Sequence, residues 1–403
     1  MEKVVLAYSG GLDTSVCIHW LRYKKGYRVI ALIIDLGQKQ YLEPLGEGAI
    51  AAGAETAYVS DLREVFVKDY IFKALKANAR HTSGYLFSTA LSRPLIVAEL
   101  ARVAHEEGCS TIGHGCSPKG NDQVRFEAAA AAIASDLKIV APLREWEMRS
   151  REEEIEYAHA HGIPIRVSSD RPHSLDVNLW GASIRCGHLE DPWSEPGEDT
   201  YVMTRPIEKA PDSPRYVEID FEQGVPVALD GKKLGPVDLI ETLNGIAGEH
   251  GVGRLDTIED RITGIKTREI YEAPAATVLL TAHAALEDFV LSGDLLKQKH
   301  HLSHVYSDII YNGMWFSRLR ESLDRFFDET QRYVTGIVRL KLYKGNCVVV
   351  GRASKYSLYD YELATYTTAS KFDPASAEGF LDLFSLPLRA EAKQRKAADG
   401  GER

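Results

Sequence analysis

Short, continuous apolar runs alternate with longer segments of helical spacing through about the first 165 residues of the chain. A strand that is covered on both faces of a sheet needs no polar side, so each continuous run predicts a buried strand. The predicted strands are 4–8, 29–34, 56–59, 111–113, 139–141 and 163–167, and the predicted helices between them include 95–105, 126–135 and 150–161. This alternation predicts an α/β fold with a doubly wound parallel sheet, which binds ligands beyond the carboxyl ends of its strands.

The pattern changes after about residue 167, because residues 170–215 are rich in Pro, Gly, Ser, Trp and Asp and contain few periodic segments. Residues 216–221 alternate, 224–226 form a predicted turn, and 227–229 pair back through Asp230-Gly231, which predicts a hairpin. The other elements predicted here are helices at 237–249 and 277–297 and a hairpin of 338–343 with 347–350. We expect this half of the chain to be an α+β domain.

The last predicted element is a helix at 375–396 that Pro387 interrupts and that ends in a charged tail. Its apolar residues follow helical spacing after the last domain, so we expect them to contact another subunit. The residues of this stripe are Phe380, Leu381, Leu383, Phe384 and Leu388. The predicted domains are 1–167, 168–370 and 371–403.

Composition narrows the function classes. The formal net charge of −10 argues against general nucleic-acid binding, which needs a basic surface. Five cysteines without Cys-x-x-Cys spacing predict reduced thiols in a cytoplasmic protein, and neither a disulfide framework nor a zinc site. We expect no signal peptide and no membrane span. His300, His301 and His304 have helical spacing but no supporting carboxylates or cysteines, so no metal site is predicted there.

Residues 9–15, Ser-Gly-Gly-Leu-Asp-Thr-Ser, lie between the first predicted strand and a helix. Glycines let the backbone turn sharply and approach a ligand, and a helix N-terminus offers N–H groups and a positive dipole end. Ser9, Thr14 and Ser15 add hydroxyl groups, so the segment predicts a socket for a multiply charged anion. The competing interpretation is a plain Gly-Gly turn with a helix cap, which the coincidence of these features disfavours.

Asp13 is the exception in this loop, since a bare carboxylate repels phosphate. It is expected to bind Mg²⁺ or to accept N–H groups of the loop. The loop lacks the Gly-Lys-Ser/Thr ending of a Walker A motif and the spacing of dinucleotide-binding loops.

A second motif at residues 114–127 leaves a predicted strand, loops, and enters a helix. It carries Asn121, Asp122 and Arg125 within five residues, and the last two share one helical face. An amino-acid zwitterion needs a carboxylate for its ammonium group and donors for its carboxylate. The motif therefore predicts an amino-acid site.

The loop at 9–15 resembles the pyrophosphate loop of the N-type ATP pyrophosphatases, which release pyrophosphate whole. The string at 114–127 resembles the argininosuccinate synthase family within that group. The same family pattern continues, in order and from residue 4 to about 387, at 85–94, 174–181, 189–192, 248–254, 259–261, 270–274, 311–316 and 357–359.

This resemblance implies an adenine nucleotide alpha-hydrolase-like domain, then an α+β synthetase domain that binds citrulline and aspartate, and a C-terminal oligomerisation helix of a homotetramer. It implies ATP as substrate with Mg²⁺, no prosthetic group, and no nucleic-acid or membrane partner. The implied reaction joins citrulline and aspartate through citrullyl-AMP and yields argininosuccinate, AMP and pyrophosphate.

The resemblance also implies roles for single residues. Asp13, Asp122 and Arg125 are the implied catalytic residues. ATP is implied to bind Ala7, Tyr8, Ser9, Gly10, Gly11, Leu12, Asp13, Thr14, Ser15, Ile34 and Gly115. The implied aspartate positions are Ser117, Asn121 and Asp122. The implied citrulline positions are Tyr85, Asn121, Arg125, Ser174, Ser183, Glu259 and Tyr271, with Thr89 and Arg93 in the same cleft.

Four positions depart from the family pattern. Ser117-Pro118 stands where Thr-Gly is usual, which keeps the hydroxyl but removes one N–H. Ala90 replaces a common Ser, and Arg185 stands where the family usually has an acid. A paralogue that joins citrulline or a related ureido compound to another amine therefore stays open.

Two further alternatives are a tRNA-modifying pyrophosphatase and a non-catalytic binding relative. The first would need a catalytic pair of cysteines and a basic RNA surface, which the acidic charge and the cysteine spacing disfavour. The second is disfavoured by the intact loop and the intact charged string.

Overall fold

The computed structural model describes residues 2–38, 42–164 and 174–398. It divides into two units, residues 1–356 and 357–403, which are described separately. The strand predicted at 163–167 falls mostly outside the described residues. The domain boundaries predicted at 167 and 370 stay predictions.

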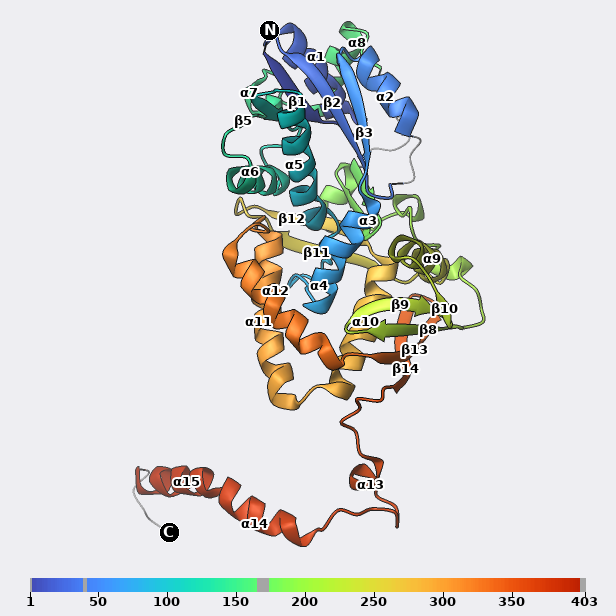
Figure 1. Cartoon of the computed structure of the whole chain (residues 1–403), viewed down its shortest axis with the longest axis vertical. Helices are drawn as coiled ribbons and strands as arrows, with labels where there is room; N and C mark the ends of the chain where they lie inside the picture. The colour runs from blue at the N-terminus through green and yellow to red at the C-terminus, as the bar shows by residue number, and fades with distance from the viewer. Residues whose placement is uncertain (1, 39–41, 165–173, 399–403) are drawn as a thin grey trace. The chain divides into compact units, whose positions relative to one another are not determined.

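A five-stranded parallel sheet forms the first part of the larger unit (Figure 1). Its order is β3-β2-β1-β4-β5, with strands β1 (Lys3–Ala7), β2 (Arg28–Asp35), β3 (Thr56–Asp61), β4 (Thr111–Gly113) and β5 (Lys138–Val140). The chain runs from β1 outward to β3 and then returns to the other side of β1. The order thus reverses between β1 and β4, and ligands of such sheets bind at this reversal.

Both faces of this sheet are covered, as the continuous apolar runs predict. Val4 and Leu6 belong to one apolar core, whereas Val5 between them belongs to the other. The covering helices are α1 (Leu12–Tyr23), α2 (Leu42–Ala51), α5 (Ser88–Glu106), α6 (Asp122–Ile133), α7 (Pro142–Glu145) and α8 (Arg151–Ala160). The doubly wound sheet is therefore confirmed.

The helix predicted at 95–105 begins seven residues earlier in the structure, at Ser88, and Pro94 lies inside it. The hydroxyl of Tyr85 accepts hydrogen bonds from the amides of Thr89 (2.9 Å) and Ala90 (3.2 Å), so a side chain from outside the helix caps its first turn. This cap is invisible to apolar spacing.

The rest of the larger unit contains two antiparallel sheets. The four-stranded sheet has the order β11 (Arg254–Asp260), β12 (Lys266–Glu272), β7 (Gly181–Arg185) and β6 (Ser174–Asn178). The five-stranded sheet has the order β10 (Lys232–Lys233), β9 (Val225–Leu229), β8 (Arg215–Glu222), β13 (Gly336–Tyr343) and β14 (Asn346–Ala353). The predicted hairpin of β13 and β14 is confirmed, and the expected α+β half is observed.

Two predictions need correction here. The turn of the β8–β9 hairpin is Gln223-Gly224, both with positive φ, whereas Val225 and Pro226, predicted in the turn, belong to β9. The helix predicted at 277–297 is two helices, α10 (Pro274–Val290) and α11 (Gly293–Tyr311), because Leu291 is extended and Ser292 caps the second helix.

The remaining helices of this unit are α9 (Pro236–Glu249), α12 (Arg318–Thr330), α3 (Arg63–Val65), the π-helix η1 (Phe66–Ile71) and α4 (Phe72–Lys76). Short 3₁₀ turns are η2 (Gly187–Glu190), η3 (Glu198–Thr200), η4 (Ile207–Lys209) and η5 (Gln331–Tyr333). One apolar core continues from Val5 and Ile30 of the parallel sheet to Leu279 of α10 and Val338 of β13.

The four-stranded sheet is tied to the carboxyl end of the parallel sheet. The amide of Leu179 donates to the carbonyl of Leu36 just after β2 (2.8 Å), and Asn178 Nδ2 donates to the carbonyl of Ser88 (2.7 Å). These contacts bring residues 174–185 to the edge where ligands of parallel sheets bind.

The smaller unit contains α13 (Tyr361–Ala364), α14 (Ala375–Phe384) and α15 (Leu386–Ala398). The predicted break lies at Ser385, two residues before Pro387. No side chain is buried in α14 or α15, both of which the structure describes in full. Their apolar stripe is therefore not covered by other residues of the smaller unit.

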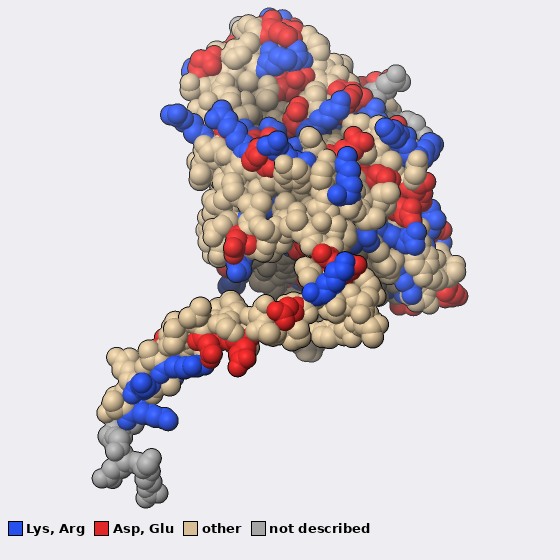
Figure 2. Space-filling view, turned by 60° about the horizontal axis from the view of Figure 1, so that its bottom comes forward, with Lys and Arg blue, Asp and Glu red and all other residues tan. Residues whose placement is uncertain are grey.

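No helix among the described residues is both long and apolar enough to cross a membrane. On the face that Figure 2 shows, basic and acidic side chains are intermixed rather than gathered into a broad basic surface.

Candidate active site

The phosphate loop connects β1 with α1 at the reversal of the strand order. Gly11 is the N-cap of α1 and makes no side-chain cap hydrogen bond. Gly10 has φ +77°, and a Cβ at this position would lie 2.3 Å from Leu45 Cδ2. The turn therefore requires glycine at position 10 and leaves the N-terminus of α1 accessible to an anion.

The hydroxyl groups of this loop have different surroundings. Ser9 Oγ and Thr14 Oγ1 are 3.2 Å apart, near the mouth of the loop. Ser15 is fully buried, and its Oγ lies 3.2 Å from the Tyr8 hydroxyl. Ser15 thus supports the loop from inside, whereas Ser9 and Thr14 lie where a phosphate would approach.

Gly115, just after β4, lies against the same loop. A Cβ at this glycine would lie 2.9 Å from Thr14 Cγ2, so the segment after β4 can pass α1 this closely only without a side chain. Ile34, near the end of β2, is 8% exposed. Gly115 thus contacts the loop, and Ile34 lies on β2, which pairs with β1 on its other side.

Glu154 of α8 joins the loop although no sequence motif marks it. Burial, the negative charge of Asp13 and a hydrogen bond with the Asp13 carboxyl group together raise the pKa of Glu154 to about 8. Two carboxyl groups thus meet beside the phosphate loop. Oxygen donors of this kind suit Mg²⁺.

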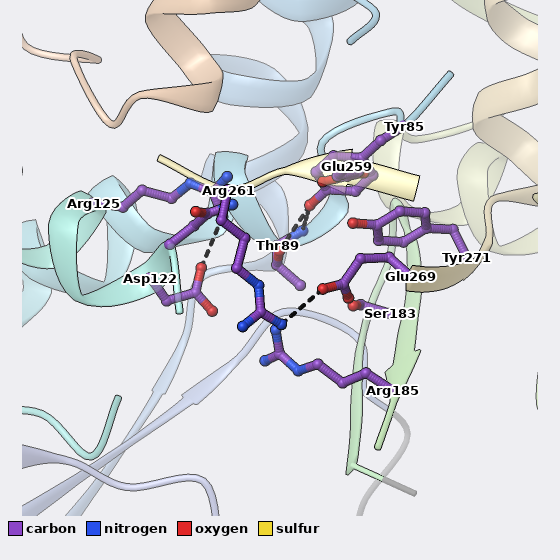
Figure 3. Close-up of a pocket in the computed structure, with 11 residues that line it drawn as sticks. Tyr85, Thr89, Asp122, Arg125, Ser183, Arg185, Glu259, Arg261, Glu269 and Tyr271 are labelled. Carbon is purple, nitrogen blue, oxygen red and sulfur yellow. Dashed lines mark hydrogen bonds and ion pairs between the residues drawn. The ribbon is translucent and has the colours of Figure 1, made fainter. Parts of the chain in front are cut away.

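A second pocket opens on one face of the four-stranded sheet (Figure 3). Side chains of a strand alternate between the two faces, and directly paired residues share a face. Ser183 pairs with Tyr271 and with Asp176, and Arg185 pairs with Ser174. The residues that line the pocket are Tyr85, Thr89, Asn121, Asp122, Arg125, Ser183, Arg185, Glu259, Arg261, Glu269 and Tyr271.

The opposite face of these strands is apolar at the same place, where Ile184 and Ile270 pack with Leu189. One face of the sheet therefore serves the core, and the other serves the pocket.

Asp122 lies at the start of α6 between two arginines. Its Oδ2 accepts from Arg93 Nη2 (2.8 Å), and its Oδ1 accepts from Arg125 Nη1 (2.9 Å). Burial opposes ionisation, but the positive charges of Arg93 and Arg125 hold the pKa of this carboxyl well below its usual range. Arg93 also contacts Asp176 of β6. The group is therefore a fixed negative charge inside a charged network.

Arg125 is held on its other side by the last residue of α11. Its Nε donates to the carbonyl of Tyr311 (2.9 Å), and its guanidinium lies 5.1 Å from the centre of the Tyr311 ring. Its Nη2 is buried and has no partner within the described chain. One arm of the guanidinium thus remains for a ligand in the pocket.

The aromatic wall of the pocket is a stacked pair, Tyr85 and Tyr271, with ring centres 4.1 Å apart. Burial raises the pKa of both hydroxyl groups, so they are neutral near pH 7. Burial also raises the pKa of Glu259, whose carboxylate accepts from Tyr311 (3.1 Å) and Ser83 (3.2 Å). This wall offers an apolar surface with polar edges.

Asn121 is more constrained than the motif suggests. Its Nδ2 donates to the Tyr311 hydroxyl (3.0 Å), and its Oδ1 accepts from the amide of Ile262 (2.8 Å). In this state its amide joins the loop before α6 to the sheet.

The structure thus brings eight of the predicted residues together in one pocket: Tyr85, Thr89, Asn121, Asp122, Arg125, Ser183, Glu259 and Tyr271. Ser174 shares the same sheet face, Arg93 is buried behind Asp122, and Ser117 lies in the exposed loop before α6. The motifs at 174–181, 259–261 and 311–316 contain Asp176, Arg261 and Tyr311 but gave them no role, and no motif contains Glu154 or Glu269. Arg185 was noted only as a departure. The individual ligand assignments stay predictions.

Comparison with known proteins agrees with this geometry. Residues 3–164 match the family model "Arginosuccinate synthase N-terminal HUP domain", and residues 173–391 match "Arginosuccinate synthase C-terminal domain". Argininosuccinate synthase of Dehalococcoides mccartyi is 53% identical, over 97% of this chain and 96% of that protein. The Pelotomaculum thermopropionicum protein of the same name is also 53% identical, over 99% of both chains.

Among solved structures, a predicted subunit of a tRNA methyltransferase from Methanocaldococcus jannaschii is similar at 17% identity, with a TM-score of 0.29, over 40% of this chain and 76% of that one. This similarity is too low to inform function. The two family models and the full-length relatives show that the chain belongs to the argininosuccinate synthase family.

Proposed function

We propose that the phosphate loop and the charged pocket together condense citrulline with aspartate at the expense of ATP. The ureido oxygen of citrulline attacks the α-phosphorus of ATP, and pyrophosphate leaves with the bonding electrons. The amine of aspartate then attacks the ureido carbon of citrullyl-AMP, AMP leaves, and the amine loses a proton. The product is argininosuccinate, an intermediate of arginine biosynthesis.

The observation that carries this proposal is the meeting of two sites at one sheet edge. The loop at 9–15 offers an N-terminal helix end to phosphate, and the pocket offers buried groups of both signs to an amino acid. A ureido carbon is a poor electrophile, so adenylation supplies a leaving group, and the rest of catalysis is positioning and charge stabilisation.

In the nucleotide site, Ala7–Ser15 of the loop segment, Ile34 and Gly115 are proposed to bind ATP. Asp13, with Glu154 beside it, has the oxygen donors that Mg²⁺ prefers. The ion, when bound with ATP, neutralises phosphate charge. The chain's own contribution is to orient the α-phosphorus toward the pocket and to hold the leaving pyrophosphate at the start of α1.

In the amino-acid site, Tyr85, Asn121, Arg125, Ser174, Ser183, Glu259 and Tyr271 are proposed to bind citrulline, and Ser117, Asn121 and Asp122 to bind aspartate. Support comes from the buried, unpaired Nη2 of Arg125 and from the stacked tyrosines, which suit a neutral ureido chain. Asp122 stays ionised and so can attract an ammonium group.

A homotetramer in the cytoplasm completes the proposal. The exposed apolar stripe of α14 and α15 supports the oligomer. The cysteines, which show no disulfide pattern, support the cytoplasmic location.

The function is tested by pyrophosphate release with ATP and Mg²⁺, adding citrulline and aspartate separately and together. We expect sustained release only with both amino acids and argininosuccinate as the product. Release that needs a different amine would contradict the proposal.

Asp13→Ala tests the role of the loop in the same assay. We expect turnover to fall below detection, whereas Asp294→Ala, an exposed acid on α11, should leave it unchanged. Near-normal turnover of the Asp13 variant would remove this residue from the reaction.

A further inference from the structure

Two buried polar atoms and one guanidinium in the amino-acid pocket have no hydrogen-bond partner among the described residues. Arg125 Nη2 and Glu269 Oε2 are unpaired, and their side chains belong to residues that are 3% and 4% exposed. The side chain of Arg185 lines the same pocket and makes neither a hydrogen bond nor an ion pair with the residues that the structure describes. A buried charge without a partner is costly, so the pocket is built for a ligand that carries charge of both signs.

The position of Arg185 follows from strand geometry. It is the last residue of β7, two residues after Ser183, so both side chains leave the same face of the sheet. Ile184 pairs with Ile270 of β12, which places Arg185 across from Glu269 in the adjoining position. Figure 3 shows the guanidinium of Arg185 extending from β7 toward Arg261 and Glu269.

Arg185 lies on the side of the pocket that is bordered by Asp122 and Glu269. Burial lowers the pKa of its guanidinium, but the negative charges of Asp122, Glu269 and Asp176 outweigh burial and keep it charged. The positive charge of Arg185 helps to lower the pKa of Asp122 and partly offsets the rise that burial causes in the pKa of the Cys116 thiol. Both of these residues border the segment 116–122, which holds the implied aspartate positions.

That segment has one N–H donor fewer than the family pattern usually has. Pro118 has no N–H, where the family pattern usually has glycine. The Ser117 hydroxyl accepts from the amide of Lys119 (3.3 Å) and so turns partly toward its own loop. Lys119 is an exposed cation of the segment itself, and Arg185 adds a guanidinium from the pocket side whose side chain has no hydrogen-bond partner among the described residues.

We propose that Arg185 binds a carboxylate of the amine donor and thereby selects a dicarboxylic amino acid such as aspartate. This assignment rests on the proposed function and deepens it. The planar fork of the guanidinium holds a carboxylate by two parallel hydrogen bonds, which a lone hydroxyl or amide cannot reproduce. Glu269, whose Oε1 accepts from Arg261 (3.0 Å), flanks the site and limits the approach of a second carboxylate.

Steady-state kinetics of Arg185→Ala separate this role from the others. We expect the KM for aspartate to rise roughly 10- to 100-fold, the effect of losing hydrogen bonds to a charged group. The KM for citrulline should change less than about twofold, because citrulline binds through the tyrosine side of the pocket. Arg185→Lys should recover part of the aspartate affinity, and Arg185→Glu should lose more than Arg185→Ala.

Arg332→Ala, an exposed arginine of η5, is the matched control and should leave both constants unchanged. Circular dichroism of each variant establishes that it is folded. An unchanged KM for aspartate in Arg185→Ala would overturn the proposal, and so would an equal rise for citrulline and aspartate.

The wild-type assay keeps the two proposals apart. If the wild-type chain releases pyrophosphate with citrulline and aspartate, the proposed function stands, and the variants alone decide the role of Arg185. If it does not, the proposed function fails before Arg185 is tested with aspartate. Other amines are then tested in place of aspartate for pyrophosphate release. If the amine that supports release carries no second carboxylate, the proposed role of Arg185 is refuted.

Discussion

At the scale of single residues, Arg125 divides its guanidinium between the protein and the pocket. Nε donates to Tyr311 and Nη1 to Asp122, and Nη2 has no hydrogen-bond partner in the described chain. We predict that Arg125→Ala raises the KM for citrulline roughly 10- to 100-fold. Arg125→Lys should not restore it, since a lysine cannot reproduce the fork.

Initial-rate measurements over a range of citrulline concentrations check this prediction. Arg102→Ala, an exposed arginine of α5, is the control for a general loss of positive charge. A citrulline KM that stays at the wild-type value in Arg125→Ala would remove this residue from the pocket.

We predict that Glu154 makes the stability of the folded chain depend on pH. Its pKa is about 8 in the folded chain and 4.5 for an ordinary glutamate side chain, so the folded state holds a proton that the unfolded state releases between these values. The contribution to stability is complete below about pH 4.5 and is lost as the pH rises through about 8. Glu154→Gln, which cannot ionise, should lack this loss.

Thermal unfolding from pH 5 to 9, without ATP and Mg²⁺, measures the effect. Between pH 5 and 8 the Tm of the wild-type chain should fall relative to that of Glu154→Gln. The neighbouring exposed variant Glu156→Gln should track the wild type. Parallel Tm curves for wild type and Glu154→Gln would show that the two carboxyl groups do not share a proton.

Residues of local motifs were predictable, whereas their distant partners were not. Asp13, Asp122 and Arg125 belong to short strings whose chemistry is visible in one reading of the sequence. Glu154 lies in an acidic run of a surface helix, and Tyr311 ends a helix far along the chain, so only folding brings them to the site. Single-sequence patterns carry no information about such meetings.

At the scale of secondary-structure elements, α10 and α11 are joined by a buried ion pair. Lys299 Nζ lies 3.0 Å from Glu287 Oε2, and both side chains are essentially unexposed. Gln331 Nε2 donates to Glu287 Oε1 (2.6 Å), so the carboxylate also holds η5. The network thus links α10, α11 and η5.

We predict that Lys299→Met lowers the free energy of unfolding by about 3–5 kcal/mol, because it leaves the Glu287 charge buried without its counter-ion. Adding Glu287→Gln should recover most of this loss. Urea unfolding of the single and double variants checks both statements. If the double variant is no more stable than Lys299→Met, the cost lies in packing rather than in charge.

The same junction shows where element prediction failed. Apolar spacing runs through 277–297 without interruption, so the sequence indicated one helix. The amide of Leu295 donates to the hydroxyl of Ser292 (3.4 Å), and this cap, with extended Leu291, starts a new helix. Caps compete locally with helix continuation, and periodicity does not weigh them.

At the scale of the whole molecule, the exposed apolar stripe of the C-terminal unit leads to a prediction about the oligomeric state. The rings of Phe380 and Phe384, one turn apart on α14, stack at 5.3 Å and are exposed. If this stripe joins subunits, the Phe380→Asp/Phe384→Asp double variant should dissociate the proposed tetramer. Light scattering after gel filtration should then give masses below four times 44.7 kDa.

The double variant Glu391→Ser/Lys393→Ser on α15 is the control and should keep the wild-type mass. A wild-type chain that elutes as a monomer would contradict the tetramer, and a double phenylalanine variant of wild-type mass would move the interface elsewhere.

The parallel sheet was predictable because strands buried on both faces are continuous apolar runs. The second half was predicted only as a class. Its pocket depends on antiparallel pairing between residues about 90 positions apart, such as Ser183 with Tyr271, and pairing of that range leaves no local signal.

That pairing has an evolutionary consequence. In β7, Ser183 and Arg185 face the ligand pocket, while Ala182 and Ile184 face the opposite side of the sheet. One inserted or deleted residue would exchange the two sets and place Ile184 in the pocket. The strand therefore tolerates changes of chemistry but not of length. Lineages of this fold are expected to alter their substrates through point replacements at alternate positions, with insertions confined to the connecting loops.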